Sequence, residues 1–222
     1  MFRELLALIG KRAAARIHPP YGESTINTIY NLLFCDDLAL YKAHFAGQPT
    51  GVWEILFSES PSIEALTQIG STQQEESRVR ALAFNLLKAK GQAVPSRKLL
   101  GVIVEVALPG GLDVLAVYQD HSIRYINQTG KLVVWEVPDL TIDGQAQELL
   151  AASQNVIMKI GPWHKPRLPA PSKGNARMTF VVSDGLYLGQ GPITQLQRDP
   201  IGGRVIASAG ALLATLVEKA TK

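Results

Sequence analysis

Six acidic and histidine side chains are of the types that act as general acids, general bases or metal ligands. They are Asp36, Asp37, His44, Asp120, His121 and Asp184. Paired carboxylates can hold a divalent cation or separate their pKa values for acid–base work, and imidazole changes its charge near neutral pH. A hydrolase-like enzyme whose residues converge only in the folded chain is therefore one hypothesis for the function.

The spacing of these residues matches no established catalytic or metal-binding motif. The four histidines, at positions 18, 44, 121 and 164, are far apart, and zinc-binding spacings such as HxH and HExxH do not occur. The GxSxG, Walker A and GxGxxG patterns do not occur either. We therefore assign no catalytic residue, no cofactor or cofactor-binding residue and no metal ligand, and a non-catalytic protein is the preferred interpretation.

Local structure accounts for most of these residues without any chemistry. Asp36 and Asp37 are adjacent, and neighbours on a helix point about 100° apart, so the pair indicates a helix end or cap better than a shared ion. Asp120, His121 and Asp184 fall in predicted tight turns, where aspartate is common for conformational reasons. These positions mark turns and helix boundaries.

The segment from residue 159 to 177 is the most distinctive part of the surface. It has no acidic residue, and its five cations are Lys159, Lys165, Arg167, Lys173 and Arg177. Its four prolines favour an extended backbone, which suits a partner-binding arm as well as a solvated linker. We predict protein–protein binding of the adaptor or inhibitor type. The predicted partner-binding residues are Trp163, His164, Lys165, Arg167, Lys173 and Arg177.

Nucleic-acid or anion binding is a further alternative. Basic residues mixed with Trp163 and His164 are typical of surfaces that bind single strands, and Lys11, Arg12 and Arg16 form a second basic cluster. The whole chain has 22 basic and 19 acidic residues, which gives a net charge of only +3. Bulk charge therefore disfavours a nucleic acid as the partner.

The single cysteine, Cys35, excludes an intramolecular disulfide bond and suits a reducing compartment. It lies in an apolar run and is predicted to be a buried core residue. The apolar stretch at residues 5–9 is too short for a secretory signal. The longest uncharged apolar stretch, residues 205–217, is shorter than the roughly 20 residues of a membrane helix. We expect a soluble cytoplasmic protein with no membrane span.

The N-terminal part of the chain is predicted to be mainly helical. An amphipathic helix is expected over residues 2–16, and Ser24 is expected to cap a second helix with a clear apolar stripe. Residues 52–57 read as a strand, and residues 61–70 read as a short helix.

The helix that follows has the clearest boundaries. Thr72 and Glu75 form a capping box, and Gly91 stands where a C-terminal cap belongs. The apolar face between them consists of Val79, Leu82, Ala83, Leu86 and Leu87.

After Pro95 the hydrophobic period changes from that of a helix to that of a strand. Four strands are expected at residues 101–108, 113–118, 122–127 and 131–136. Their short connections require antiparallel pairing in a meander. A second hairpin is expected from residue 178 to 188, because Asp184-Gly185 between apolar runs favours the positive φ angles of a hairpin turn.

The fold class is therefore α+β. A helical N-terminal half precedes a β-meander of about six strands with the second hairpin, packed against helices that include residues 144–158 and a C-terminal helix at 202–219. We predict one domain over residues 1–222, with a division into 1–94 and 95–222 as the alternative. Small residues on the back of the last helix also permit a homodimer; they are Gly203, Ala207, Gly210 and Ala214.

Overall fold

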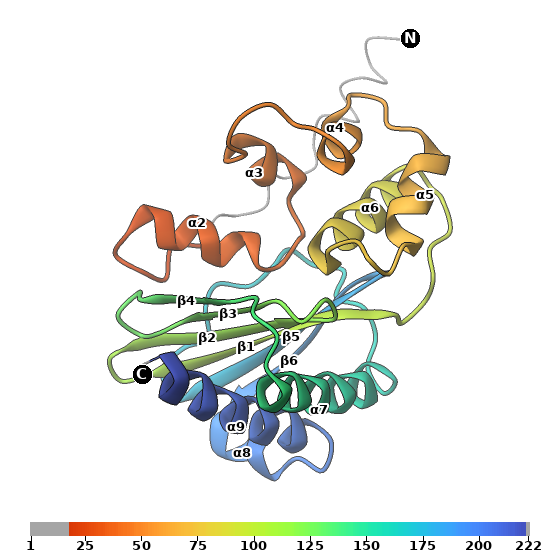
Figure 1. The fold of residues 1–222 in the computed structure, drawn as a ribbon. Coiled ribbons are helices and arrows are strands. Elements are labelled where there is room, and N and C mark those ends of the chain that lie inside the picture. Colours follow the sequence, from red (N-terminus) through yellow and green to blue (C-terminus); the bar gives the residue numbers. More distant parts are fainter. Residues whose placement is uncertain (1–17, 221–222) are drawn as a thin grey trace.

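The computed structural model describes residues 18–220 and is built around a six-stranded antiparallel sheet (Figure 1). The strands are β1 (Leu99–Leu108), β2 (Gly111–Tyr118), β3 (Ile123–Ile126), β4 (Leu132–Trp135), β5 (Asn175–Val182) and β6 (Gly185–Pro192). Their order in the sheet is β4-β3-β2-β1-β5-β6. The second hairpin thus pairs with β1, and the meander and the hairpin form one continuous sheet.

Helices cover both faces of this sheet (Figure 1). One face carries α2 (Ser24–Leu32), α3 (Leu38–Ala43), α4 (Val52–Phe57), α5 (Ile63–Ser71) and α6 (Ser77–Ala89). The other carries α7 (Leu140–Ile157), α8 (Ile193–Arg198) and α9 (Gly202–Ala220). The predicted α+β class, with about six strands and a C-terminal helix, is confirmed.

Two hydrophobic cores join the three layers. Side chains alternate along a strand, so Ile103 of β1 packs with Leu33 and Leu82 in the N-terminal layer, whereas Val104 packs with Leu149 and Leu212 on the other side. Strand β1 is paired along both edges and buried on both faces, which explains its nearly continuous apolar sequence.

The predicted meander and second hairpin are both confirmed. Strands β1 and β2 pair up to the turn at Leu108 and Gly111. Strands β5 and β6 join through Ser183 and Asp184, and Gly185 has a φ of +135°. Strand β5 is longer than its apolar run, because ladder pairing with β6 begins at Asn175.

The predicted strand at residues 52–57 is wrong, since Val52–Phe57 forms helix α4. A short apolar run suits a buried helix as well as a strand. Helical spacing places the rings of Trp53 and Phe57 5.4 Å apart, and Phe45 packs 5.3 Å from the first and 5.2 Å from the second. This aromatic cluster, which the local sequence does not reveal, stabilises the helical conformation.

Two predicted helix caps are also wrong. Ser24 is the first residue of α2, and the residue in the cap position, Glu23, makes no side-chain hydrogen bond to the helix. Thr72 does not cap α6, because its hydroxyl donates to the Gln68 carbonyl at the end of α5. Both errors follow from reading a cap from sequence spacing alone.

Helix α6 begins at Ser77, and the carboxylate at its start comes from the turn between β2 and β3. Asp120 Oδ2 accepts from the Ser77 N–H over 2.7 Å, and Ser77 Oγ accepts from the Asp120 N–H over 3.1 Å. The predicted end is confirmed, because Gly91 has a φ of +74° and the Gln92 N–H donates to the Leu87 carbonyl, as in a Schellman motif.

The remaining helices differ little from the prediction. Helix α7 begins at Leu140 rather than at residue 144, because the Asp139 carboxylate accepts from two backbone N–H groups of its first turn. Helix α9 is confirmed, and α8 is a short helix that was not predicted. Among residues 18–220, no helix has the length and apolar character needed to cross a membrane. The predicted helix at residues 2–16, with its basic cluster, lies outside the described residues.

Candidate partner-binding site

Residues 160–174, named here the arm, connect α7 to β5. Near its start, Pro162 forms an antiparallel bridge with Tyr187 of β6, and the Trp163 N–H donates to the Leu186 carbonyl over 2.7 Å. At its end, the Gly174 N–H donates to the Ala107 carbonyl over 2.9 Å. The arm is therefore attached to the sheet at both ends.

Arg177 holds the middle of the arm through hydrogen bonds from the protein interior. This residue of β5 is only 1% exposed, and its guanidinium donates to the carbonyls of Leu168 and Pro169 and, over 2.8 Å, to Gln190 Oε1. The arm carbonyls satisfy donors that would otherwise be buried without a partner. A side chain that the sequence places in a basic surface loop is thus part of the interior.

Glu105 provides the opposite charge for Arg177. The two residues face each other across the β1–β5 pair, and Arg177 Nη1 lies 3.4 Å from Glu105 Oε2. The Tyr30 hydroxyl donates to Glu105 Oε1 over 2.7 Å. Burial raises the pKa of Glu105, whereas the Arg177 charge and the Tyr30 hydroxyl act to lower it.

Arg167 attaches the arm to the N-terminal layer. Its Nε donates to Asp36 Oδ2 and its Nη2 donates to Asn31 Oδ1, both over 2.9 Å. The guanidinium also lies 4.2 Å above the centre of the Phe34 ring. His18 Nε2 donates to the Arg167 carbonyl over 3.1 Å, and burial lowers the pKa of this histidine, which favours its neutral form.

An open cleft of about 900 Å³ lies between the arm and α6. Its apolar lining includes Phe34, Val181 and Leu186. Three cationic side chains line it, namely Lys88, Lys165 and Arg167. Among the described residues that line it, Asp36 is the one carboxylate, and Arg167 already pairs with it. We name this space the arm cleft.

The structure brings some of the predicted partner-binding residues together and separates others. Trp163, Lys165 and Arg167 line the arm cleft. His164 and Lys173 are exposed but lie outside its lining, and Arg177 is buried beneath it.

Other parts of the chain also contribute residues to the cleft, and the sequence alone does not indicate them. Lys88 of α6, Phe34 after α2, and His18 all line the cleft. No local pattern marks them, because tertiary packing alone brings them next to the arm.

The six candidate catalytic residues do not converge on one place. Asp36 is at the arm cleft, while Asp37 caps α3 by accepting from two backbone N–H groups. His44 is exposed at the end of α3. The Asp184 carboxylate accepts from the Tyr187 hydroxyl over 3.1 Å.

The remaining two, Asp120 and His121, line a second cleft of about 590 Å³. There His121 Nδ1 lies 3.4 Å from Asp143 Oδ1, and the Ser122 hydroxyl donates to Asp120 Oδ1 over 2.7 Å. His121 has a φ of +66°, a backbone conformation that non-glycine residues seldom adopt. Within residues 18–220, no group of three or more histidine, cysteine or acidic side chains could hold a metal ion.

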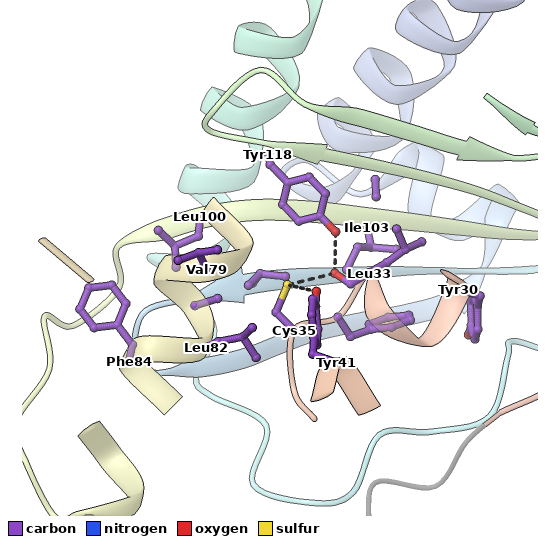
Figure 2. Packing of buried hydrophobic residues seen from close by; sticks show 14 of the residues in the cluster. Tyr30, Leu33, Cys35, Tyr41, Val79, Leu82, Phe84, Leu100, Ile103 and Tyr118 are labelled. Atoms are coloured by element: carbon purple, nitrogen blue, oxygen red, sulfur yellow. Dashed lines mark hydrogen bonds between the residues drawn. The ribbon is translucent and has the colours of Figure 1, made fainter. Parts of the chain in front are cut away.

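Cys35 is a core residue, as predicted. It is fully buried, and its Sγ lies 3.6 Å from the Tyr41 hydroxyl (Figure 2). The Tyr118 hydroxyl donates to the nearby Leu33 carbonyl over 2.6 Å (Figure 2). Burial raises the pKa of the Cys35 thiol to about 12.

We expect Cys35 to react very slowly with iodoacetamide while the protein is folded. The thiolate is the reactive form, and a pKa of about 12 instead of 9.0 lowers its fraction at neutral pH about a thousandfold. Mass spectrometry of the alkylated protein with time measures the rate, and guanidinium-unfolded protein is the control. Equal rates in the folded and unfolded protein would contradict the buried position.

The arm cleft is chemically suited to binding. Its lining combines cationic and apolar side chains, and the buried Arg177 holds the arm through the carbonyls of Leu168 and Pro169. Comparison of the chain with protein-family models, with curated proteins and with solved structures finds no match.

Proposed function

We propose that this protein is a non-catalytic binding protein that holds a segment of another protein in the arm cleft, as an adaptor or an inhibitor does. One observation carries the proposal. A cleft of about 900 Å³, lined by apolar side chains and by three cationic ones, is built from distant parts of the chain. Ligand sites are typically concave, largely apolar and provided with a few placed polar groups.

The rigidity of the arm supports this proposal. Arg177 holds the carbonyls of Leu168 and Pro169, and Arg167 is fixed by Asp36 and Asn31. A wall that is already ordered loses little conformational entropy when a partner binds. The arm therefore presents Trp163 and Lys165 from a fixed backbone.

The proposed compartment is the cytoplasm. The one cysteine of the chain is buried and has its thiol pKa raised to about 12, so the fold uses it as an apolar side chain. A protein that needs no disulfide bond is suited to a reducing environment.

Site-specific photo-crosslinking in cells tests the proposal. A photoreactive phenylalanine analogue replaces Pro166, which is exposed and lines the cleft, or Lys159, which is exposed and lies outside the lining. We expect a discrete crosslinked protein from position 166 and none from position 159. Adding the substitution Leu186→Arg, which places a bulky charge on the cleft floor, is expected to abolish the product.

Where a crosslinked product forms, two results would count against a binding role for the cleft. One is the same product from both positions, and the other is a product from position 166 that persists with Leu186→Arg. Circular dichroism of the purified variants shows whether each one is folded. Failure to obtain any crosslink at position 166 would likewise overturn the proposal.

A further inference from the structure

We infer that the occupant of the arm cleft is an acidic, extended peptide segment in which carboxylate and apolar side chains alternate. This inference rests on the proposed function, because it specifies the chemistry of the partner at the same site. It follows from the cations of the lining, from its apolar side chains and from the cations that already contact its aromatic rings.

The charge of the lining favours an anionic ligand. Among the described residues that line the cleft, Lys88, Lys165 and Arg167 are the cationic side chains, and the one carboxylate, Asp36, pairs with Arg167. Lys88 donates to the backbone carbonyl of Asp184. Because a carbonyl is neutral, this contact does not neutralise the charge of the lysine. A partner segment with carboxylates would therefore meet complementary potential, which increases both the association rate and the specificity.

Arg167 is committed to contacts within the protein and does not add to the accessible charge. Its side chain is 5% exposed, and its Nε and Nη2 atoms donate to Asp36 and Asn31. The exposed cations of the lining are therefore Lys88 and Lys165.

The accessible apolar side chains of the lining favour a ligand that also carries apolar side chains. Pro166 and Pro169 are exposed, and Leu168 and Leu186 are half-buried. An extended peptide turns successive side chains to opposite sides, so an alternating sequence presents one set to these apolar side chains and the other set to the lysines. A uniformly charged ligand would leave the apolar side chains without a partner.

The aromatic rings favour a peptide over a nucleic acid. Binding of single strands depends on aromatic faces on which bases stack. Here the Arg167 guanidinium covers a face of Phe34 at 4.2 Å, and the Lys165 ammonium lies 5.7 Å from the centre of the Trp163 ring. Cations thus already occupy faces of both aromatic rings that line the cleft.

Fluorescence anisotropy with defined probes tests this inference on the full chain. The probes are a labelled octapeptide of alternating glutamate and leucine, the same peptide with lysine in place of glutamate, and a single-stranded octanucleotide. We expect the glutamate peptide to bind, and to bind more weakly as the salt concentration rises. The lysine peptide and the oligonucleotide should not bind.

Two charge reversals locate the site. Lys165→Glu, in the lining, should weaken binding of the glutamate peptide about tenfold. Lys159→Glu, an exposed lysine outside the lining, should change it less than twofold, within the range of weak surface charge effects. Tighter binding of the lysine peptide or of the oligonucleotide, or equal effects of both substitutions, would overturn the inference.

The failure of this inference and that of the proposed function are distinguishable. If position 166 still crosslinks a protein in cells but the glutamate peptide does not bind, the acidic segment is wrong and the protein-binding cleft stands. If position 166 crosslinks nothing, the cleft itself is not a protein-binding site.

Discussion

Replacing Arg177 with methionine is expected to lower the free energy of unfolding by about 3–5 kcal/mol at neutral pH. The substitution leaves the carboxylate of Glu105 buried without an opposite charge, at a site where both side chains are almost inaccessible to solvent. It also removes the donors to the carbonyls of Leu168 and Pro169. Urea denaturation followed by tryptophan fluorescence measures the change.

The deficit of this variant should become smaller in acid. Burial already raises the pKa of Glu105 above its ordinary value, and loss of the Arg177 charge raises that pKa further. The folded state then binds a proton more readily than the unfolded state, so stability increases as the pH falls through the folded-state pKa toward the ordinary value. The difference in unfolding free energy between wild type and Arg177→Met should therefore decrease from neutral to mildly acidic pH.

Two further variants test whether the stability loss of Arg177→Met comes from the buried charge of Glu105 or from the loss of any cationic side chain. The double variant Glu105→Gln, Arg177→Met removes the charge while leaving an acceptor for the Tyr30 hydroxyl, so we expect it to be more stable than Arg177→Met alone. Lys173→Met, on the exposed end of the arm, should change the stability by less than about 0.5 kcal/mol. A loss below about 1 kcal/mol for Arg177→Met would contradict a buried ion pair.

Substituting alanine for Gly111 is the second change with a large expected effect, a loss of about 3 kcal/mol of stability. Gly111 begins β2 with a φ of +148°, a conformation that residues with a Cβ atom rarely adopt. An added Cβ would also overlap the backbone carbonyl oxygen of Gln128, in the turn between β3 and β4. That turn is held against β2 by a hydrogen bond from the Gln128 N–H to the Asp113 carboxylate.

The neighbouring Gly110 is the matched control. A Cβ atom there would meet the Gln128 side-chain Oε1 at 2.6 Å, and this flexible end of the side chain can move away. Gly110→Ala should therefore cost less than about 1 kcal/mol in the same denaturation experiment. Equal losses for the two alanine variants would contradict a specific requirement for glycine at position 111, whether from its φ angle or from the Gln128 carbonyl.

Both stability predictions concern groups whose importance comes from distant neighbours. Arg177 reads in the sequence as one more cation of a proline-rich loop, yet it lies opposite Glu105, which is far away along the chain. Gly111 reads as a hairpin glycine, yet the carbonyl that excludes a side chain belongs to another turn. The stability of the arm cleft and of the meander thus depends on tertiary contacts at these positions.

Elements with local sequence signals were predictable without the structure. Gly91 ends α6 because an achiral residue adopts positive φ at low cost, and the Asp184-Gly185 turn joins β5 to β6 for a similar reason. The apolar stripe of α9 and the alternation along the meander strands are local periodicities, and the structure confirms them.

The other features depend on contacts between residues that are distant in the sequence. Helix α6 begins where Asp120, in the turn between two strands, accepts from the Ser77 N–H. In helix α4, Phe45 packs on the rings of Trp53 and Phe57, a contact that the local sequence does not indicate. Whether an arginine of the basic segment faces solvent or the interior depends on whether a carboxylate lies within reach. The pairing of β5 with β1 places Glu105 next to Arg177, and the packing of the N-terminal layer places Asp36 next to Arg167. These contacts join residues that are distant in the sequence, so no local pattern predicts them.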